Sequence, residues 1–403
     1  MADYVYTPTE RSRARARRRE LAQDASLLAR LDWVLLAAVG AIVAYGLWVV
    51  SGITRDDVPG NPSYYIVRQA VFIAVGLAGF VAVLVIDPDV YRRLKRPVYL
   101  GTLGTFAVVF LGGTVARGSK RWIDLGFFRF QPSEFGKVLV VLCLAGFLAE
   151  RHRRVHEGRT VVSAIAIAGV PMLLVFIQPD IGSALVYASA LFAVLFVAGT
   201  RWLHLCVIGV TTVVIAMAVL WWLPAAGLPV LKDYQEARLT GFLNPDKDPQ
   251  GATYNITQSV TAVGSGGATG RGVSGATQTN LNYLPEHATD FAFASLAEQR
   301  GFLGAGFLLM LYLLVVWRGL KIISVARDPF SAIAAAGIVF GFLFQVFVNV
   351  GMTIGVAPVT GIPLPLVSVG GSSMVANLVA VGLLQAFRAR GRVGRRGAFS
   401  LFY

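Results

Sequence analysis

The sequence places two carboxylates four residues apart in Leu284–Phe291, which reads Leu-Pro-Glu-His-Ala-Thr-Asp-Phe. On a helix, Glu286 and Asp290 would share one face, and neighbouring carboxylates disfavour ionisation of both. One of the pair could then act as a general base and accept the proton of an attacking hydroxyl. The alternative, which the spacing slightly favours, places Asp290 in the first turn of a helix with Thr289 as its cap.

A cation follows a proline-led helix start in the segment Gln131–Glu134. Pro132 at the first helical position and Glu134 in the first turn are ordinary helix-start residues. Lys137 lies one turn further on, inside an apolar stretch, where a cation is costly unless it is paired or used. Because Glu134 and Lys137 can pair on one helix face, we expect them to line a site, with Arg121 as a further cation before it.

Two outside clusters are also candidates for substrate contact. In Gln178–Ser183, Asp180 is as consistent with a tight turn and a helix start as with a ligand contact. The Gly-rich stretch Gly264–Gly272 follows Gln258 and contains Arg271. Gly-rich backbone beside an arginine can present its N–H groups to a phosphate. Such stretches are often only mobile, and this one matches neither the P-loop nor the dinucleotide-binding pattern.

Three prolines and several glycines occur at membrane depth in Pro358–Ser373. They predict irregular backbone, which a membrane tolerates only where it is buried in protein or lines a cavity. Ser372 lies near the end of this segment and is a further candidate for substrate contact. Gln345, Asn349 and Asn377 approach the segment from flanking helices, where interhelical hydrogen bonding explains their amides as well as substrate binding does.

The elements that must position these residues are apolar helices. Of the 403 residues, 56% are hydrophobic and 14% are charged, whereas soluble domains carry about 25% charged residues. This composition excludes a soluble globular protein, and two cysteines with dispersed glycines and prolines exclude disulfide-rich, collagen-like and disordered chains. The sequence predicts an all-α polytopic membrane protein with ten transmembrane helices at residues 32–52, 66–87, 97–116, 133–150, 160–178, 180–199, 202–222, 301–318, 330–352 and 366–387.

The distribution of basic residues predicts the orientation of these helices. With the N-terminus inside, 24 of the 36 lysines and arginines fall on inside segments, as the positive-inside rule requires. An even number of spans returns the C-terminus to the same side, so the net charge of +14 reflects topology and indicates no nucleic-acid partner. We expect a disordered basic cytoplasmic tail at 1–30, a membrane domain at 31–388 and a second basic tail at 389–403.

One extracytoplasmic loop, residues 223–300 between the seventh and eighth spans, is far longer than the other connections. Loops much longer than about 15 residues are uncommon and usually functional. This loop is acidic in balance, whereas the outside segment 117–137 is basic. A carboxylate base on the loop would therefore face a basic patch on the segment 117–137.

The clusters occur in the order found in the SEDS family of bacterial peptidoglycan polymerases, which the chain resembles from about residue 32 to 388. The motifs are Arg121-Trp122-Ile123 with Gln131–Lys137, then Gln178-Pro179-Asp180, Gly264–Gly272, Leu284–Phe291 and Pro358–Ser373. The segment from Phe242 to Gly251 is more similar to the elongation branch of the family than to its division branch.

The resemblance implies a bacterial cytoplasmic membrane protein with an extracytoplasmic active site. The implied substrate is lipid II, polymerised into β-1,4 glycan with release of undecaprenyl pyrophosphate, and the implied partner is a class B penicillin-binding protein. Asp290 corresponds to the essential carboxylate of the family. The chain departs from the family motif with Ala288 at the usual His position and His287 at the variable one, and with Gln299 where a second acid is usual.

Residues and resemblance together predict that Asp290 takes the proton of the acceptor sugar's 4-hydroxyl as this oxygen attacks the donor's anomeric carbon. The predicted substrate-binding residues are Arg121, Glu134, Lys137, Asp180, Gln258, Arg271, Glu286 and Ser372. The three cations among them would stabilise the leaving pyrophosphate. A divalent cation, Mg²⁺ or Mn²⁺, could assist, but the sequence shows no cluster of metal ligands.

Three alternative functions remain. A lipid II flippase would need polar residues across the whole bilayer, whereas here they concentrate in the outer half and the outside loops. A division-specific polymerase would carry the same motifs, and only the segment 242–251 favours the elongation branch over it. A non-catalytic scaffold of a cell-wall complex would not require Asp290.

Overall fold

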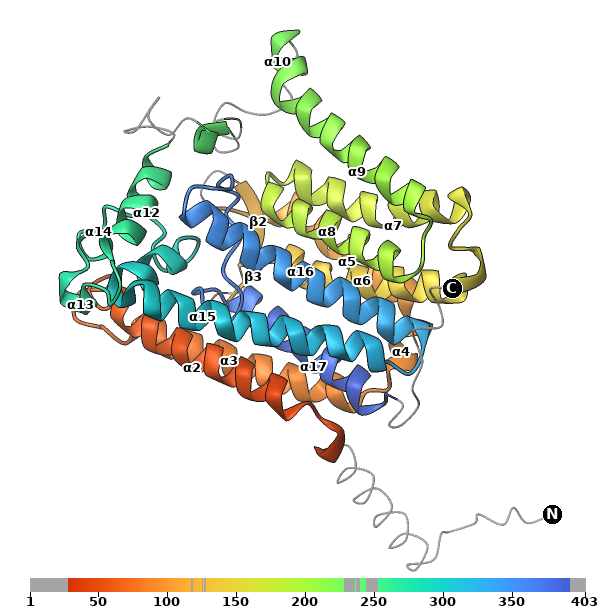
Figure 1. The fold of residues 1–403 in the computed structure, drawn as a ribbon, viewed down its shortest axis with the longest axis horizontal. Coiled ribbons are helices and arrows are strands. Elements are labelled where there is room, and N and C mark those ends of the chain that lie inside the picture. Colours follow the sequence, from red (N-terminus) through yellow and green to blue (C-terminus); the bar gives the residue numbers. More distant parts are fainter. Residues whose placement is uncertain are drawn as a thin grey trace, which may run out of the picture.

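The computed structural model describes residues 28–116, 119–124, 126, 128–227, 236, 240–243 and 253–391. Within these ranges most helices run side by side in one bundle, with the short helices of residues 254–280 at one end and the short helix Pro88–Arg93 at the other (Figure 1). The predicted tails at 1–30 and 389–403 lie largely outside the described residues. Residues 244–252, which carry most of the segment that resembles the elongation branch, also lie outside them.

Helices occupy all ten segments that the sequence predicts to span a membrane. They are α2 (Trp33–Ile53), α3 (Tyr64–Val85), α5 (Lys95–Gly112), α6 (Pro132–Glu150), α7 (Gly158–Ile177), α8 (Ile181–Val197), α9 (Trp202–Met217), α15 (Ala292–Val325), α16 (Pro329–Thr353) and α17 (Gly371–Ala389). Among the described residues, eight of these helices are long and apolar enough to cross a membrane, with α9 counted as part of the continuous helical segment Trp202–Ala225. The other two are α8, which has only 17 residues, and α5, whose hydropathy is lowered by Lys95 and Arg96.

The centre of the bundle consists of α6, α16 and α17. In their most apolar windows 72%, 72% and 89% of the residues are buried, against 6% for the segment Trp202–Ala225 that begins with α9. α17 packs along α3, α16 packs along α8 and α15, and α15 packs along α2. α9 leaves the bundle at an angle and continues into the π-helical turn η2 (Ala218–Trp222) and α10 (Leu223–Ala225) (Figure 1). The three central helices therefore provide the firmest support for a site.

The mostly helical chain includes three short strands, and the predicted span at 97–116 ends before them. α5 ends at Gly112, and the chain continues into β1 (Thr114–Ala116), β2 (Ser119–Asp124) and β3 (Arg129–Phe130), an antiparallel sheet in the order β1-β2-β3. Two glycines, Gly112 and Gly113, weaken the helix, and β-branched and aromatic residues that favour strands follow them. The sheet leads directly into α6 and brings Arg121 to the start of that helix.

Two predicted spans begin at other residues in the structure. α17 begins at Gly371 and not at residue 366, because residues 354–370 form irregular backbone with positive φ at Gly361 and Leu366. α15 begins at Ala292, well before the predicted residue 301. The described part of the predicted loop 223–300 holds η3 (Gly241–Leu243), α12 (Tyr254–Ser265), α13 (Gly272–Gly275) and α14 (Thr277–Asn280), while α4 (Pro88–Arg93) and η1 (His152–Arg154) lie in the connections at the opposite end.

The Gly-rich stretch enters a break in α15. At Gly301 the backbone is not helical (φ 65°, ψ −168°). The N–H groups of Phe302 and Leu303 donate instead to the carbonyl oxygens of Gly267 and Ala268, at 2.8 and 3.0 Å. These bonds satisfy donors that the break would otherwise leave without partners.

Glycine is required in this stretch because two backbones pack directly against each other. A Cβ atom on Gly266 would collide with the carbonyl group of Ala297, and one on Gly270 would collide with the backbone of Gln299. The N–H of Arg271 donates to the carbonyl of Glu298 at 2.9 Å. In this structure, the stretch predicted to bind phosphate joins the loop to α15.

One buried carboxylate ties three helices together at the opposite end of the bundle. Asp32 caps α2 by accepting a hydrogen bond from the N–H of Leu35 at 3.1 Å. It also accepts from Arg318 at distances down to 2.6 Å and pairs with Arg388 at 3.2 Å, which brings in α15 and α17. The amide of Gln385 bonds the backbone N–H and carbonyl of Asp32 at 2.8 and 3.1 Å. The sequence alone indicated no role for Asp32.

Replacing Asp32 with alanine is expected to destabilise the protein strongly, since it leaves two arginines without their shared carboxylate. Loss of one partner of a buried ion pair costs about 3–5 kcal/mol. The melting temperature of the detergent-solubilised protein is the measurement. Asp89→Ala, which removes an exposed pair with Arg92, is the control and should cost about 1 kcal/mol or less. Equal melting temperatures for the two variants would contradict this account.

Gly266→Ala is expected to lower the melting temperature, because its Cβ cannot fit against α15. Gly264→Ala is the matched control two residues away, since a Cβ there meets no atom within 4 Å. It lies in helix α12, so alanine should stabilise it by about 0.5–1 kcal/mol. If instead both variants melt like the parent and only activity falls, the stretch serves a ligand and the packing explanation fails.

Candidate functional site

The predicted carboxylate segment is a compact turn and not part of a helix. α15 begins at Ala292, no side chain caps it, and its first turn holds no acidic residue. The interpretation of Asp290 as a first-turn residue capped by Thr289 was therefore wrong, as was the shared helix face. Instead, Glu286 adopts positive φ (58°), and its carbonyl accepts from the N–H groups of Thr289 and Phe291 at 3.0 and 3.1 Å. The Thr289 hydroxyl donates to the Glu286 carboxylate at 2.8 Å.

Four successive carbonyl groups of this turn are bound by groups from elsewhere. The Ser295 hydroxyl donates to the carbonyl of residue 287 at 3.2 Å, and the N–H of Val369 donates to that of residue 288 at 2.9 Å. The Ser368 hydroxyl donates to the carbonyl of residue 289. The Asn349 amide donates to the carbonyl of Asp290 at 2.8 Å and to that of residue 362 at 2.7 Å. The turn is thus fixed to α16 and to the irregular segment 354–370.

The Asp290 side chain is half-buried and lies against the proline-rich segment. A Cβ atom on Gly361 would lie 3.3 Å from its Oδ2 atom, and Gly361 has positive φ (72°). A Cβ on Gly182 would lie 2.7 Å from the carbonyl oxygen of Thr360. This segment therefore connects the carboxylate turn with the start of α8, where Asp180 is located.

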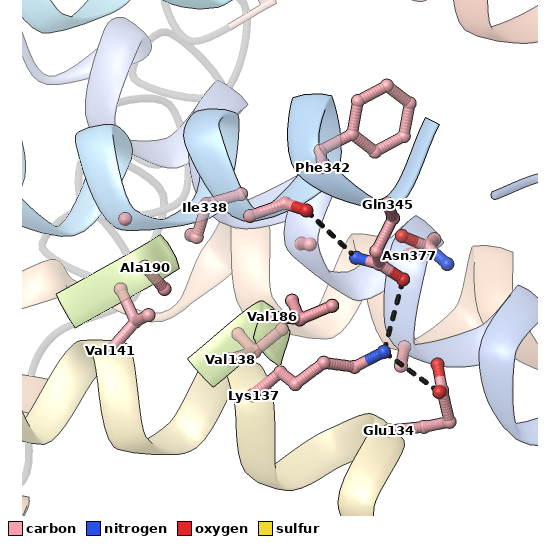
Figure 2. Close-up of a pocket in the computed structure, with 14 residues that line it drawn as sticks. Glu134, Lys137, Val138, Val141, Val186, Ala190, Ile338, Phe342, Gln345 and Asn377 are labelled. Atoms are coloured by element: carbon pink, nitrogen blue, oxygen red, sulfur yellow. Dashed lines mark hydrogen bonds and ion pairs between the residues drawn. The ribbon is translucent and has the colours of Figure 1, made fainter. Parts of the chain in front are cut away.

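Lys137 and Glu134 form the buried pair that the sequence predicts. Lys137 Nζ donates to Glu134 Oε1 at 2.8 Å and to Gln345 Oε1 of α16 at 3.1 Å, as Figure 2 shows. Only 2% of Glu134 and 8% of Lys137 is exposed. The second oxygen of Glu134, Oε2, has no hydrogen-bond partner among the described residues. The three residues and Asn377 line a cavity of about 40 Å³, which is enough for a water molecule.

Arg121 and Asp180 meet, but the backbone already occupies the arginine. Its guanidinium donates to the carbonyl of Gln178 at 3.2 Å and to that of Pro179, and lies 3.8 Å from Asp180. Asp180 caps α8 through the N–H of Ser183 at 3.2 Å, so its helix-start interpretation is confirmed. The pair therefore fixes the turn between α7 and α8 to strand β2.

The remaining predicted residues lie at different places. Ser372 accepts from the N–H of Gln131 at 2.9 Å and donates to the carbonyl of Arg129 at 3.1 Å, so it joins α17 to β3. Arg271 is exposed and donates to Thr277 at 3.1 Å. Gln258 is half-buried on α12, which packs against α15 and α16.

Glu298 and Asp57 make contacts that sequence analysis missed. Buried Glu298 accepts from the N–H groups of Gln278 and Thr279 at 2.8 and 3.0 Å and so holds α14. Asp57, in the connection between α2 and α3, binds His287 at 3.0 Å. His287 lies between Glu286 and Asp290 in the sequence, which could have suggested an acidic partner for it. The sequence does not identify Asp57 as this partner, because the two residues are 230 positions apart.

The arrangement combines a candidate general base with a buried ion pair, and α16 contacts both, through Asn349 and through Gln345 one helical turn away. A half-exposed carboxylate is held rigidly by its backbone, and nearby helix starts bring a cation and an unsatisfied carboxylate oxygen to the same end of the bundle. Within the described ranges, His, Cys, Asp and Glu side chains form no group of three or more that could hold a metal ion. The chemistry that these residues themselves support is proton transfer from a polar substrate.

The comparisons with known proteins show the family of the chain. The profile of the FtsW, RodA and SpoVE cell cycle proteins matches residues 27–392. The chain is 36% identical to peptidoglycan glycosyltransferase MrdB of Escherichia coli K12 over 358 residues, which cover 88% of this chain and 93% of that protein. Among solved structures, a peptidoglycan synthase complex that coordinates polymerization and crosslinking matches with a TM-score of 0.74, 31% identity and coverage of 89% of this chain and 97% of that one.

The rod shape determining protein RodA of Thermus thermophilus has the same fold, with a TM-score of 0.64 and 27% identity. The match covers 89% of this chain and 96% of that protein. Both the length of the matches and their identity exceed what a shared fold alone would give. The chain belongs to the SEDS family, the family of the FtsW, RodA and SpoVE cell cycle proteins.

Proposed function

We propose that the chain is a peptidoglycan glycosyltransferase that polymerises lipid II into β-1,4 glycan for cell elongation. Its similarity to MrdB and RodA supports the activity. The observation that carries the proposal is the half-exposed Asp290 carboxylate on a turn whose four consecutive carbonyl groups are all bound. Such fixation holds a general base at the position that the reaction requires.

In the proposed reaction, the 4-hydroxyl oxygen of the acceptor sugar attacks the anomeric carbon of the donor. The proton of this hydroxyl passes to Asp290, and the bond from the anomeric carbon to the pyrophosphate oxygen breaks. Undecaprenyl pyrophosphate leaves with the bonding electrons. Lys137 is the cation that we assign to assist, because it lines a small cavity next to the unpaired oxygen of Glu134. Arg121 is engaged with backbone carbonyls, and Arg271 lies exposed beside α13.

The site belongs to the outer face of the bacterial cytoplasmic membrane in this proposal. All ten long helices cross the bilayer, including α5 and α8, and both basic tails lie in the cytoplasm. The positive-inside distribution of basic residues supports this orientation. The partner is a class B penicillin-binding protein, which the match to a synthase complex for polymerization and crosslinking supports.

Asp290→Ala is expected to lower glycan synthesis from purified lipid II by about 10²–10⁴-fold, the usual contribution of a general base. The variant should keep the melting temperature of the parent, since the turn is held through its backbone. The readout is the length distribution of labelled glycan, with and without the penicillin-binding protein. Normal polymerisation by the variant would refute the assignment of the base, and lipid II movement across vesicles without polymerisation would favour a flippase.

The buried pair gives a second prediction that separates stability from activity. Lys137→Met should cost about 3–5 kcal/mol of stability, because it leaves Glu134 charged, buried and unpaired. Adding Glu134→Gln should restore most of this stability, since no buried charge remains. Polymerisation should stay reduced by about 10²-fold in the double variant if Lys137 stabilises developing charge. Recovery of full activity together with stability would show that the pair has only a structural role.

A further inference from the structure

We propose that Asp57 and His287 are a pair of positioning residues that hold the carboxylate turn in its productive geometry. The inference rests on the proposed function, because it concerns the same transfer site. Neither side chain is expected to touch the reacting atoms. Together they extend the site to the connection between α2 and α3, which sequence analysis left without a role.

The pair is well formed and largely shielded from water. The Nε2 atom of His287 lies 3.0 and 3.1 Å from the two carboxylate oxygens of Asp57. The side chains are only 10% and 16% exposed. An ionised carboxylate can only accept hydrogen bonds, so Nε2 must carry the proton. The bond is therefore charge-assisted, and such bonds are about twice as strong as neutral ones.

The position of His287 in the turn allows its bond to Asp57 to restrain the backbone before Asp290. It follows Glu286, the residue with positive φ, and precedes Asp290 by three residues. The hydrogen bonds to the carbonyl groups of 288–290 all come from the side formed by Asn349, Ser368 and Val369. Asp57 binds the turn from the connection between α2 and α3, so the turn is held between two separate parts of the molecule.

The two residues that follow Glu286 in the turn have different surroundings. His287 binds Asp57. Ala288, the next residue after His287, packs into the hydrophobic core instead. An imidazole at position 287 therefore faces Asp57, whereas the side chain at position 288 faces the core.

Removal of the pair should alter the rate of the chemical step more than substrate binding. A displacement of about 1 Å in a reacting group can cost about 10²-fold in rate. All of the predicted substrate-binding residues except Glu286 lie outside this turn, so KM should change less than kcat. Because the two residues act through one bond, losing both should cost no more than losing either.

The experiment measures kcat and KM for lipid II in the full-length protein with His287→Ala, Asp57→Ala and the double variant. Each is expected to lower kcat by about 10²-fold with KM within about twofold of the parent. His287→Gln should retain most of the activity, because its amide can still donate to Asp57. Asp56→Ala is the matched control, an exposed acid one residue away, and should behave like the parent.

Hydrogen exchange gives a readout that does not depend on activity. Amides of residues 287–291 should exchange faster in the two alanine variants than in the parent, while those of α17 should not change. Costs that add in the double variant, full activity of His287→Ala, or unchanged exchange of the turn would each overturn the proposal. If the parent protein itself fails to polymerise lipid II, the proposed function fails, and the exchange result still decides whether the pair orders the turn.

Discussion

The structure depends on how the irregular backbone of residues 284–291 and 354–370 is satisfied. Both segments have only a few turn-type hydrogen bonds of their own. The two segments satisfy each other, with Val369 and Ser368 donating to the turn and Asn349 bridging both. In hydrocarbon an unpaired peptide group costs several kcal/mol, so neither segment could hold its shape without the other. The hydrogen bonds that satisfy the backbone of both segments also fix the turn that carries the Asp290 carboxylate.

The buried carboxylates at the two ends of the bundle differ in how many of their oxygens are bound. At the end away from the site, Asp32 shares its carboxylate between two arginines and the backbone N–H of Leu35, so each of its oxygens is engaged. At the other end, Glu134 pairs with Lys137 through one oxygen, and its second oxygen has no partner among the described residues. A carboxylate with both oxygens bound holds helices together, whereas an unsatisfied acceptor beside a small cavity is available to a ligand or to water.

Much of the fold could be predicted because apolar stretches of about 20 residues have few alternatives to helices. The Glu134–Lys137 pair was predictable for the same reason, since a lysine inside such a stretch must have a partner. The turn at Asp290 was not, because a positive φ at Glu286 is not encoded in carboxylate spacing. The Gly-rich composition around Gly266 and Gly270 suggested phosphate binding. Their close packing against the backbone of α15 could not be predicted, because local sequence does not reveal that contact. Contacts over hundreds of residues, such as Asp57 with His287, depend on the assembled fold.

The glycine junction at Gly301 also bears on how this chain can vary. In an uninterrupted helix, one inserted residue rotates everything that follows by about 100° and would turn every buried face outward. In α15 the helical register is interrupted, and the Gly-rich stretch supplies the missing bonds at the junction. Residues 292–300 take their position from the Gly-rich stretch and from the bonds of Glu298 to α14, and not from the helix face that packs on α2 and α16. A length change in the buried residues 292–300 would therefore disrupt these local contacts, whereas one after Gly301 would rotate the face that packs on α2 and α16.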